Sequence, residues 1–239
     1  MLKRFVIGIL SVCLVALCCI FSFDKGKSLS DLLSSVENDD AKTIIIDAGH
    51  GGFDGGAVAS DGTVEKELNL AVALKLDAVL RGMGYKTVLV RDCDTATNDP
   101  TDGGKAKVSD IKNRVKLMDR HPNSIFVSIH MNKYSTTQPH GAQVFYSNVE
   151  GSQDLAKLLQ HSVATHVQAD NKRVIKPTTK DIYLLNHATV PSVIVECGFL
   201  SNPSDLNHLK SQDYQLKLAV ALSYGIIDYL KSDVEIGES

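Results

Sequence analysis

Residues 43–52 have the sequence TIIIDAGHGG, and this stretch decides the fold. Its first four residues favour β-structure, and a run of that kind ending at a glycine-rich turn predicts a buried strand with His50 on the turn behind it. Two other apolar runs end at polar residues in the same manner, one at His130 and one at Glu196. Because ligands bind at the carboxyl ends of strands in open α/β sheets, we expect the three side chains to meet at one edge.

A fourth polar residue, Glu65, begins the helical pattern that follows the first strand. Catalytic zinc typically takes three protein ligands from histidine and carboxylate and leaves a fourth position for water. We therefore interpret His50, Glu65 and His130 as a zinc shell held by strand ends and a helix start. Bound zinc lowers the pKa of water to about 7 and polarises a carbonyl. Glu196 is the candidate base that takes the proton of that water.

Each of these residues also has an ordinary structural explanation. A lone histidine after a strand is more often a hydrogen-bonded structural residue, and a glutamate at a helix start is favoured by the helix dipole. A carboxylate after an apolar strand, in contrast, is costly unless it is paired or used. Four other histidines lie in expected helices or turns and are expected to be solvated: His121, His161, His166 and His208. Two flank expected strands and are candidates for touching substrate: His140 and His187.

The composition fits one sizeable globular domain. The chain has 239 residues, of which 44% are hydrophobic and 22% charged. The net charge of −3 gives no support for nucleic acid as a partner. The chain has no tryptophan and only 6% aromatic residues, so the composition does not indicate a surface for stacking bases. Three of the five cysteines lie in the N-terminal apolar run. Without a CxxC pair, Cys93 and Cys197 predict neither a thiolate zinc site nor a disulfide scaffold.

The N-terminal residues predict an export signal. Residues 5–23 contain no charge and follow a short basic start, and as a helix they would span about 28 Å, close to the hydrocarbon thickness of a bilayer. The run lacks a convincing small-x-small cleavage site, so 1–23 is predicted to be a signal anchor in preference to a cleaved signal peptide. Either one places the body on the extracytoplasmic face of the membrane. We expect a linker at 24–40, the catalytic domain at 41–231 and a tail at 232–239.

Strand and helix patterns alternate along the body. We expect strands at 43–47, 85–90, 124–130, 141–146, 181–185 and 192–196. We expect helices at 65–83, behind an N-cap at Ser109, at 150–168, as a short turn from Asn202, and at 213–230. Residues 92–108 lack periodicity and predict a long loop. The alternation predicts an α/β single domain with a mostly parallel or mixed sheet and helices on both faces.

Four linked motifs carry a family resemblance. They are DAGHGG with DGGA at 47–57, EKELNL at 65–70, SIHMN at 128–132 and VECGFLSN at 195–202. Over about 41–231, and in the same order, they resemble the zinc-dependent N-acetylmuramoyl-L-alanine amidases of the Amidase_3 family. The resemblance implies a six-stranded α/β fold. It also implies hydrolysis of the amide between N-acetylmuramic acid and the L-alanine of the peptidoglycan stem peptide.

The resemblance also assigns residues. It implies one Zn²⁺ per chain, bound by His50, Glu65 and His130, with Glu196 as the catalytic glutamate. Asn132 and Arg114 match further family positions, and their roles are substrate binding or support of the shell. Two departures are visible: Ala48 stands where many relatives have proline, and Cys197 adjoins the catalytic glutamate. The Cys197 side chain is expected on the opposite face of its strand.

The short format, an anchor and one catalytic domain without wall-binding repeats, resembles the spore-cortex, germination-specific amidases of endospore formers. It implies a role in cortex maturation on the way to muramic-δ-lactam, at the forespore or cortex. Peptidoglycan and, through the anchor, the membrane are the implied partners. An extracytoplasmic activator or accessory protein is a further expected partner, for which loop 92–108 is the candidate contact.

Two alternatives stay open at this point. One is a zinc carboxypeptidase acting on stem peptides, which needs an arginine to hold a free carboxylate, and Arg91 or Arg114 are available for that role. The other is a non-catalytic anchored wall-binding scaffold that retains the four site residues. The presence of all four residues argues against the scaffold.

Overall fold

The computed structural model describes residues 41–237, with side chains except at 102–104 and 233–237. The predicted signal anchor or signal peptide at 1–23 and the linker at 24–40 lie outside this range and stay predictions. Among the described residues, no helix combines the length and the apolar character that a membrane span requires.

Six strands in the described part of the chain form one mixed sheet, and its strand order is β2-β1-β3-β6-β4-β5. The strands are β1 (Thr43–Ala48), β2 (Thr87–Leu89), β3 (Ser124–Asn132), β4 (Gln143–Tyr146), β5 (Lys176–Pro177) and β6 (Ser192–Phe199). The four strands from β2 to β6 run parallel, β4 is antiparallel to β6, and β5 is parallel to β4. The prediction of a mostly parallel or mixed six-stranded sheet is therefore confirmed.

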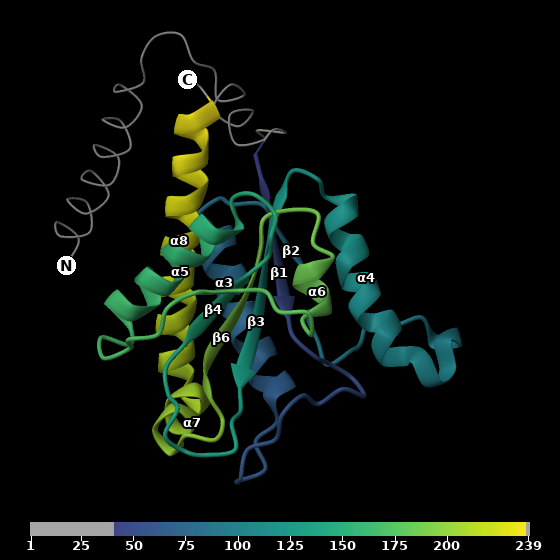
Figure 1. The fold of residues 1–239 in the computed structure, drawn as a ribbon, viewed down its shortest axis with the longest axis vertical. Helices are drawn as coiled ribbons and strands as arrows, with labels where there is room; N and C mark the ends of the chain where they lie inside the picture. Colours follow the sequence, from purple (N-terminus) through teal and green to yellow (C-terminus); the bar gives the residue numbers. More distant parts are fainter. Residues whose placement is uncertain (1–40, 238–239) are drawn as a thin grey trace, which may run out of the picture. The chain divides into compact units, whose positions relative to one another are not determined.

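Helices cover both faces of this sheet (Figure 1). The α-helices of the described residues are α3 (Glu65–Gly82), α4 (Ala106–Arg120), α5 (Ser152–His166), α6 (Tyr183–Asn186), α7 (Pro203–Lys210) and α8 (Gln212–Gly237). Residues of α3, α5, α7 and α8 pack with one set of strand side chains into a large apolar core. Residues of α4 and α6 pack with the other set into a smaller one. The arrangement gives one fully closed face and one thinly covered face.

Strand β1 shows how one sequence serves both faces. Its side chains alternate, so that Ile44 and Ile46 belong to the large core while Ile45 belongs to the small one. The next residue on the Ile45 side is Asp47, which is buried. The strand that fills the core thus ends by placing a carboxylate on the thinly covered face.

The strand predicted at 181–185 is wrong. Residues 183–186 form the single helical turn α6, and the outermost strand of the sheet is instead the two-residue β5. The physical reason lies in two consecutive buried residues, Leu184 and Leu185. A strand would send one of them to each face, whereas a helical turn lets both pack on the small core.

The long loop predicted at 92–108 is also wrong in part. Residues 100–105 form a 3₁₀-helix, and α4 begins at Ala106, three residues before the predicted N-cap. Ser109 lies inside α4, and its Oγ accepts a hydrogen bond of 3.1 Å from the backbone N–H of Asp99. The serine therefore ties the preceding loop to the helix instead of capping it.

Candidate metal centre

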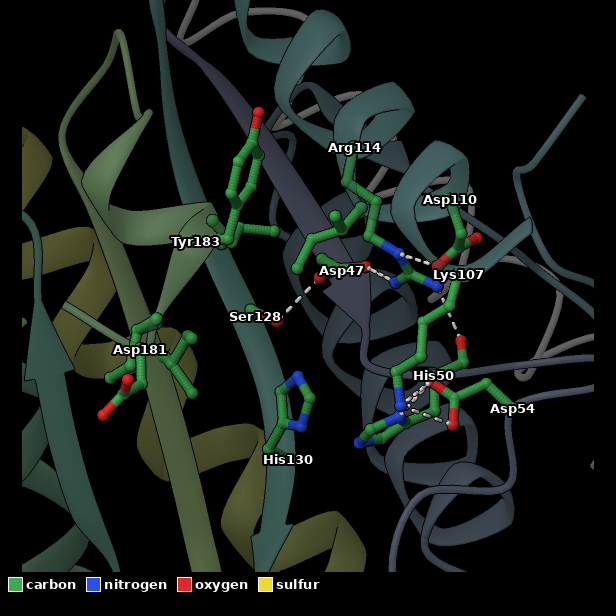
Figure 2. Close-up of a pocket in the computed structure, with 14 residues that line it drawn as sticks. Asp47, His50, Asp54, Lys107, Asp110, Arg114, Ser128, His130, Asp181 and Tyr183 are labelled. Carbon is green, nitrogen blue, oxygen red and sulfur yellow. Dashed lines mark hydrogen bonds and ion pairs between the residues drawn. The ribbon is translucent and has the colours of Figure 1, made fainter. Parts of the chain in front are cut away.

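The structure brings His50, Glu65 and His130 together. Each offers one ligand atom, and these atoms all lie within 4.8 Å of one another. Oε1 of Glu65 lies 3.3 Å from Nε2 of His50 and 3.0 Å from Nδ1 of His130. The two imidazole rings face the same pocket (Figure 2). Three elements distant in sequence, the turn after β1, the start of α3 and the end of β3, therefore meet as the sequence predicts.

Two glycines allow this close approach. A Cβ at Gly49 would lie 2.2 Å from Nε2 of His130, so any larger residue there would displace the ring. Gly56 has a φ of +71°, and a Cβ there would lie 2.6 Å from both Oε2 of Glu65 and Cδ2 of His50. The glycines of the motif thus make room for the metal ligands.

The charges and pKa values of the cluster favour a bound cation. Burial alone would raise the pKa of Glu65, but hydrogen bonds and charges from His130 and His50 outweigh it and hold the pKa well below its usual range. Burial lowers the pKa of His50, yet the carboxylates of Glu65 and Asp54 outweigh it and raise the pKa overall. Two ring nitrogens face one carboxylate oxygen, and they can do so only by carrying protons or by sharing a metal ion with it. Two imidazoles and a carboxylate are the donor set of a catalytic zinc site.

Asp54 holds the first imidazole from behind. Oδ2 of Asp54 lies 2.8 Å from Nδ1 of His50 and therefore accepts the proton of that nitrogen. Metal-binding histidines commonly donate their second N–H to a carboxylate, which fixes the tautomer and leaves the other nitrogen for the metal. No role was predicted for Asp54 from the sequence. Its position four residues after His50 in the glycine-rich motif is the signal that could have identified it.

The Glu65 carboxylate is held by three further donors. Its Oε2 accepts a hydrogen bond of 2.8 Å from the backbone N–H of Ala57. Its Oε1 accepts from the backbone N–H of Met131 at 3.2 Å and from the side-chain amide of Asn69 at 3.3 Å. The carboxylate is therefore oriented by the chain itself and does not depend on the imidazoles alone.

Two buried arginines hold the turn that carries His50. Arg91 donates to the backbone carbonyls of Ala48 at 2.8 Å and Gly49 at 3.1 Å. Arg114 donates to the carbonyl of His50 at 2.7 Å and to that of Ala48 at 3.1 Å. Three consecutive carbonyls are thus satisfied by cations, and this supports a turn in which His50 has a φ of +62°.

Arg114 is also paired with two carboxylates, Asp47 at the end of β1 and Asp110 one turn earlier on α4. Its side chain is 4% exposed, and its hydrogen bonds go to the chain itself. These contacts favour support of the metal turn over direct contact with substrate. Asn132 lies at the end of β3, where the register with β6 shifts. The substrate-binding roles of both residues stay predictions.

Glu196 is the direct register partner of His130 across β3 and β6. Partners in adjacent parallel strands point to the same face, so its carboxylate lies beside the metal cluster. Its Oε2 is buried without a hydrogen-bond partner among the described residues. Burial raises the pKa of Glu196 to about 7. A carboxylate with such a pKa can accept and return a proton near neutral pH. Cys197 packs into the large core behind the sheet, which confirms that it points to the other face.

A pocket of about 220 Å³ opens beside the two imidazoles. Ser128 on β3 and Ile194 on β6 line part of it. Lys107 lines it from α4, and Asp181 and Tyr183 line it from the segment 181–184 (Figure 2). None of these lining residues was predicted from the sequence. Their approach depends on how α4 and α6 pack against each other, which no local pattern encodes.

The remaining histidines lie outside the metal cluster. His187 stacks on Tyr183 with ring centroids 3.8 Å apart. His140 bonds to the carbonyl of Gln138 and lines a separate cavity. Neither lines the pocket beside the metal cluster, so their contact with substrate stays a prediction. The four other histidines are not among its lining residues either.

The chain matches the family model Amidase_3, described as N-acetylmuramoyl-L-alanine amidase, over residues 44–228. It is 34% identical over 196 residues to the germination-specific N-acetylmuramoyl-L-alanine amidase of Bacillus subtilis (strain 168), and the match covers 79% of each chain. It is 31% identical over 193 residues to the amidase LytC of the same strain, covering 80% of this chain and 36% of LytC. All four predicted site residues fall within the matched part.

Solved structures give the same relationship. The CwlD amidase from Clostridioides difficile, determined in complex with the GerS lipoprotein, is 38% identical and superposes with a TM-score of 0.76, covering 80% of this chain and 99% of that chain. An N-acetylmuramoyl-L-alanine amidase from Clostridium difficile 630 is 29% identical with a TM-score of 0.71, covering 81% of this chain and 98% of that chain. The similarity therefore extends through the fold that carries the metal cluster.

Proposed function

This chain belongs to the Amidase_3 family of N-acetylmuramoyl-L-alanine amidases, and from that premise we propose that it binds one Zn²⁺ through His50, Glu65 and His130 and uses Glu196 as its base. The family membership predicted from the four motifs is confirmed, and the chain is a peptidoglycan amidase. The observation that carries the zinc proposal is the meeting of three ligand atoms within 4.8 Å of one another.

The residues around the cluster have two roles, proton transfer and positioning of His50. When bound, zinc polarises the scissile carbonyl and acidifies water. Glu196 accepts a proton from the attacking water and returns it to the nitrogen of L-alanine as the amide bond breaks. Its buried Oε2 has no competing donor among the described residues, so it is free for this exchange. Asp54, Arg91 and Arg114 keep His50 in place while substrate binds and leaves.

The carboxypeptidase alternative loses its support. It needs an arginine that is free to hold a terminal carboxylate, and the two candidates were Arg91 and Arg114. Both are buried and donate to backbone carbonyls of the turn at 48–50. Their relocation to bind substrate would release the turn that carries a metal ligand.

We also propose a role in the spore. That role is cortex maturation on the way to muramic-δ-lactam, and the similarity to an amidase of Bacillus subtilis that is named germination-specific supports it. Export by the N-terminal run, as anchor or signal peptide, would bring the domain to the forespore membrane. Because the CwlD structure contains a lipoprotein, an extracytoplasmic accessory protein is also proposed for this chain. Residues 92–108, which include the 3₁₀-helix at 100–105, are its candidate contact.

The proposal is tested on purified protein with purified peptidoglycan. Metal analysis should find about one zinc per chain, and mass spectrometry should find whole stem peptides released from muramic acid. A chelator should stop release, and added zinc should restore it. Release of single terminal amino acids would contradict the amidase chemistry. Deletion of the gene should remove muramic-δ-lactam from the cortex, and an unchanged lactam content would refute the spore role.

A further inference from the structure

The pocket beside the metal cluster is lined by charged residues of both signs. Its charged lining residues, apart from the histidines, are Asp47, Asp54, Asp110, Asp181, Lys107 and Arg114. Four carboxylates therefore face two cations. Because the two imidazoles and a bound Zn²⁺ would add positive charge here, a cationic group of a substrate would be attracted chiefly by a carboxylate that has no partner within the protein.

Three of the four carboxylates are already engaged. Asp47 and Asp110 share Arg114. Asp54 accepts from His50 at 2.8 Å and lies 3.2 Å from the ammonium of Lys107. Asp181 differs, because it is exposed and forms no ion pair or side-chain hydrogen bond within the described residues. It lies across the pocket from Lys107 (Figure 2).

The segment that presents Asp181 is braced on both sides. Thr179 accepts hydrogen bonds through its carbonyl from the backbone of Ile182 at 3.1 Å and from the side-chain amide of Asn186 at 2.7 Å. Tyr183 is stacked against His187. Asp181 thus belongs to an ordered wall of the pocket, and a partner can bind it without first ordering a loop.

We propose that Asp181 is a specificity residue that binds a side-chain ammonium of the stem peptide while the scissile amide lies at the metal cluster. This inference rests on the proposed function. The α-nitrogen of L-alanine is the nitrogen of the scissile bond and carries no charge before cleavage. The ammonium must therefore belong to a side chain, which makes the ligand a peptide with a diamino residue beyond the L-alanine.

The test compares two muramoyl tripeptides that differ in one group. Both end in lysine, with a free ammonium in one and an Nε-acetyl group in the other. The full-length, zinc-loaded protein is assayed as wild type, as Asp181→Asn and as Asp154→Asn, which makes the same charge change on an exposed residue of α5, away from the pocket. For the free-ammonium substrate, Asp181→Asn should raise KM about threefold to tenfold with kcat nearly unchanged.

Three comparisons decide the outcome. The wild type should prefer the free-ammonium substrate through KM, Asp181→Asn should lose that preference, and Asp154→Asn should keep it. Equal KM values of the wild type for the two substrates would overturn the proposal. An equal rise of KM for both substrates in Asp181→Asn would also overturn it, because that result indicates a structural role of the wall.

Failure of the chemistry can be told apart from failure of the specificity. If the wild type releases peptide from neither substrate, the proposed function fails for these substrates, and the Asp181 proposal is judged by calorimetric binding of the same two peptides. A lower dissociation constant for the free-ammonium peptide in the wild type alone would support it. Equal dissociation constants would refute it.

Discussion

The two faces of the sheet are built from the same strands and differ in almost every other respect. Among the described residues, thirty-one buried side chains form the core beneath α3, α5, α7 and α8, and seven form the core beneath α4 and α6. The smaller face instead buries charge, with Arg114 between Asp47 and Asp110. The difference teaches that one face supplies the stability that lets the other keep a pocket and buried charges.

Two neighbouring residues of β6 show the same difference between the two faces of the sheet. Glu196 faces the metal cluster, and Cys197 is fully buried in the large core. Burial disfavours the charged form of both and raises the pKa of each group. The shift leaves the carboxyl able to exchange protons near neutral pH and leaves the thiol neutral. The same physical effect therefore makes one residue reactive and its neighbour inert.

Replacing these two residues in turn should separate the faces most clearly. Glu196→Gln removes the proton acceptor, so kcat should fall about 10²- to 10⁴-fold while the unfolding temperature stays within a few degrees. Cys197→Ala should lower stability and leave kcat per folded molecule unchanged. Peptide release and thermal unfolding measure the two effects. A large loss of kcat in Cys197→Ala would show that the faces are not independent.

The next largest effect is expected at the buried cation of the smaller face. Arg114→Met leaves the buried carboxylates of Asp47 and Asp110 without the cation that pairs with both, and the free energy of unfolding should fall by about 3–5 kcal/mol. Zinc affinity should fall as well, because the carbonyl of His50 loses its donor. Urea unfolding and zinc titration measure the two quantities. Unchanged zinc affinity in the folded variant would mean that the turn holds its shape without the arginine.

A matched change on the larger face gives the contrast. Leu222 on α8 is fully buried, and Leu222→Ala should cost about 2–5 kcal/mol through the cavity that it leaves. Stability thus falls by an amount similar to that of Arg114→Met, but zinc affinity should not change. If both variants lose zinc in proportion to stability, metal binding reports global unfolding and the comparison between faces breaks down.

The smallest of these effects is expected behind the first imidazole. Asp54→Asn keeps the shape but weakens the hydrogen bond to Nδ1 of His50, so zinc affinity should fall about 10- to 100-fold with little change in the stability of the metal-free protein. Competition with a zinc chelator measures the affinity. Asp61→Asn, at an exposed carboxylate paired with Lys210, is the control and should leave zinc affinity unchanged.

The sequence predicted the cluster better than its surroundings. His50, His130 and Glu196 follow apolar runs, and the carboxyl ends of parallel strands meet at one edge of a sheet, so their meeting could be inferred from local patterns. Arg91 and Arg114 could not be assigned in the same way. Their hydrogen bonds reach 42 and 64 residues back along the chain, to a turn whose position depends on the packing of the whole sheet.

The pocket wall at 181–184 shows a second limit of prediction from the sequence, a wrongly assigned secondary structure. A short strand was predicted at 181–185, and tertiary packing of Leu184 and Leu185 made residues 183–186 a helical turn. The error concealed Asp181, since a strand would have been assigned to the sheet and not to the pocket. Motifs thus located the chemistry, while the groups that surround the substrate depended on contacts between α4 and α6.

His50 has the positive φ of a left-handed residue, at +62°. Glycine adopts that conformation without the penalty of about 1–2 kcal/mol that a side chain incurs. If variants of the metal-free domain were selected only for heat resistance, glycine should therefore be enriched at position 50. The selected variants would have higher thermal stability but would lack one zinc ligand. Function at this position persists against the local preference of the backbone, so only a selection that rewards catalysis can maintain it.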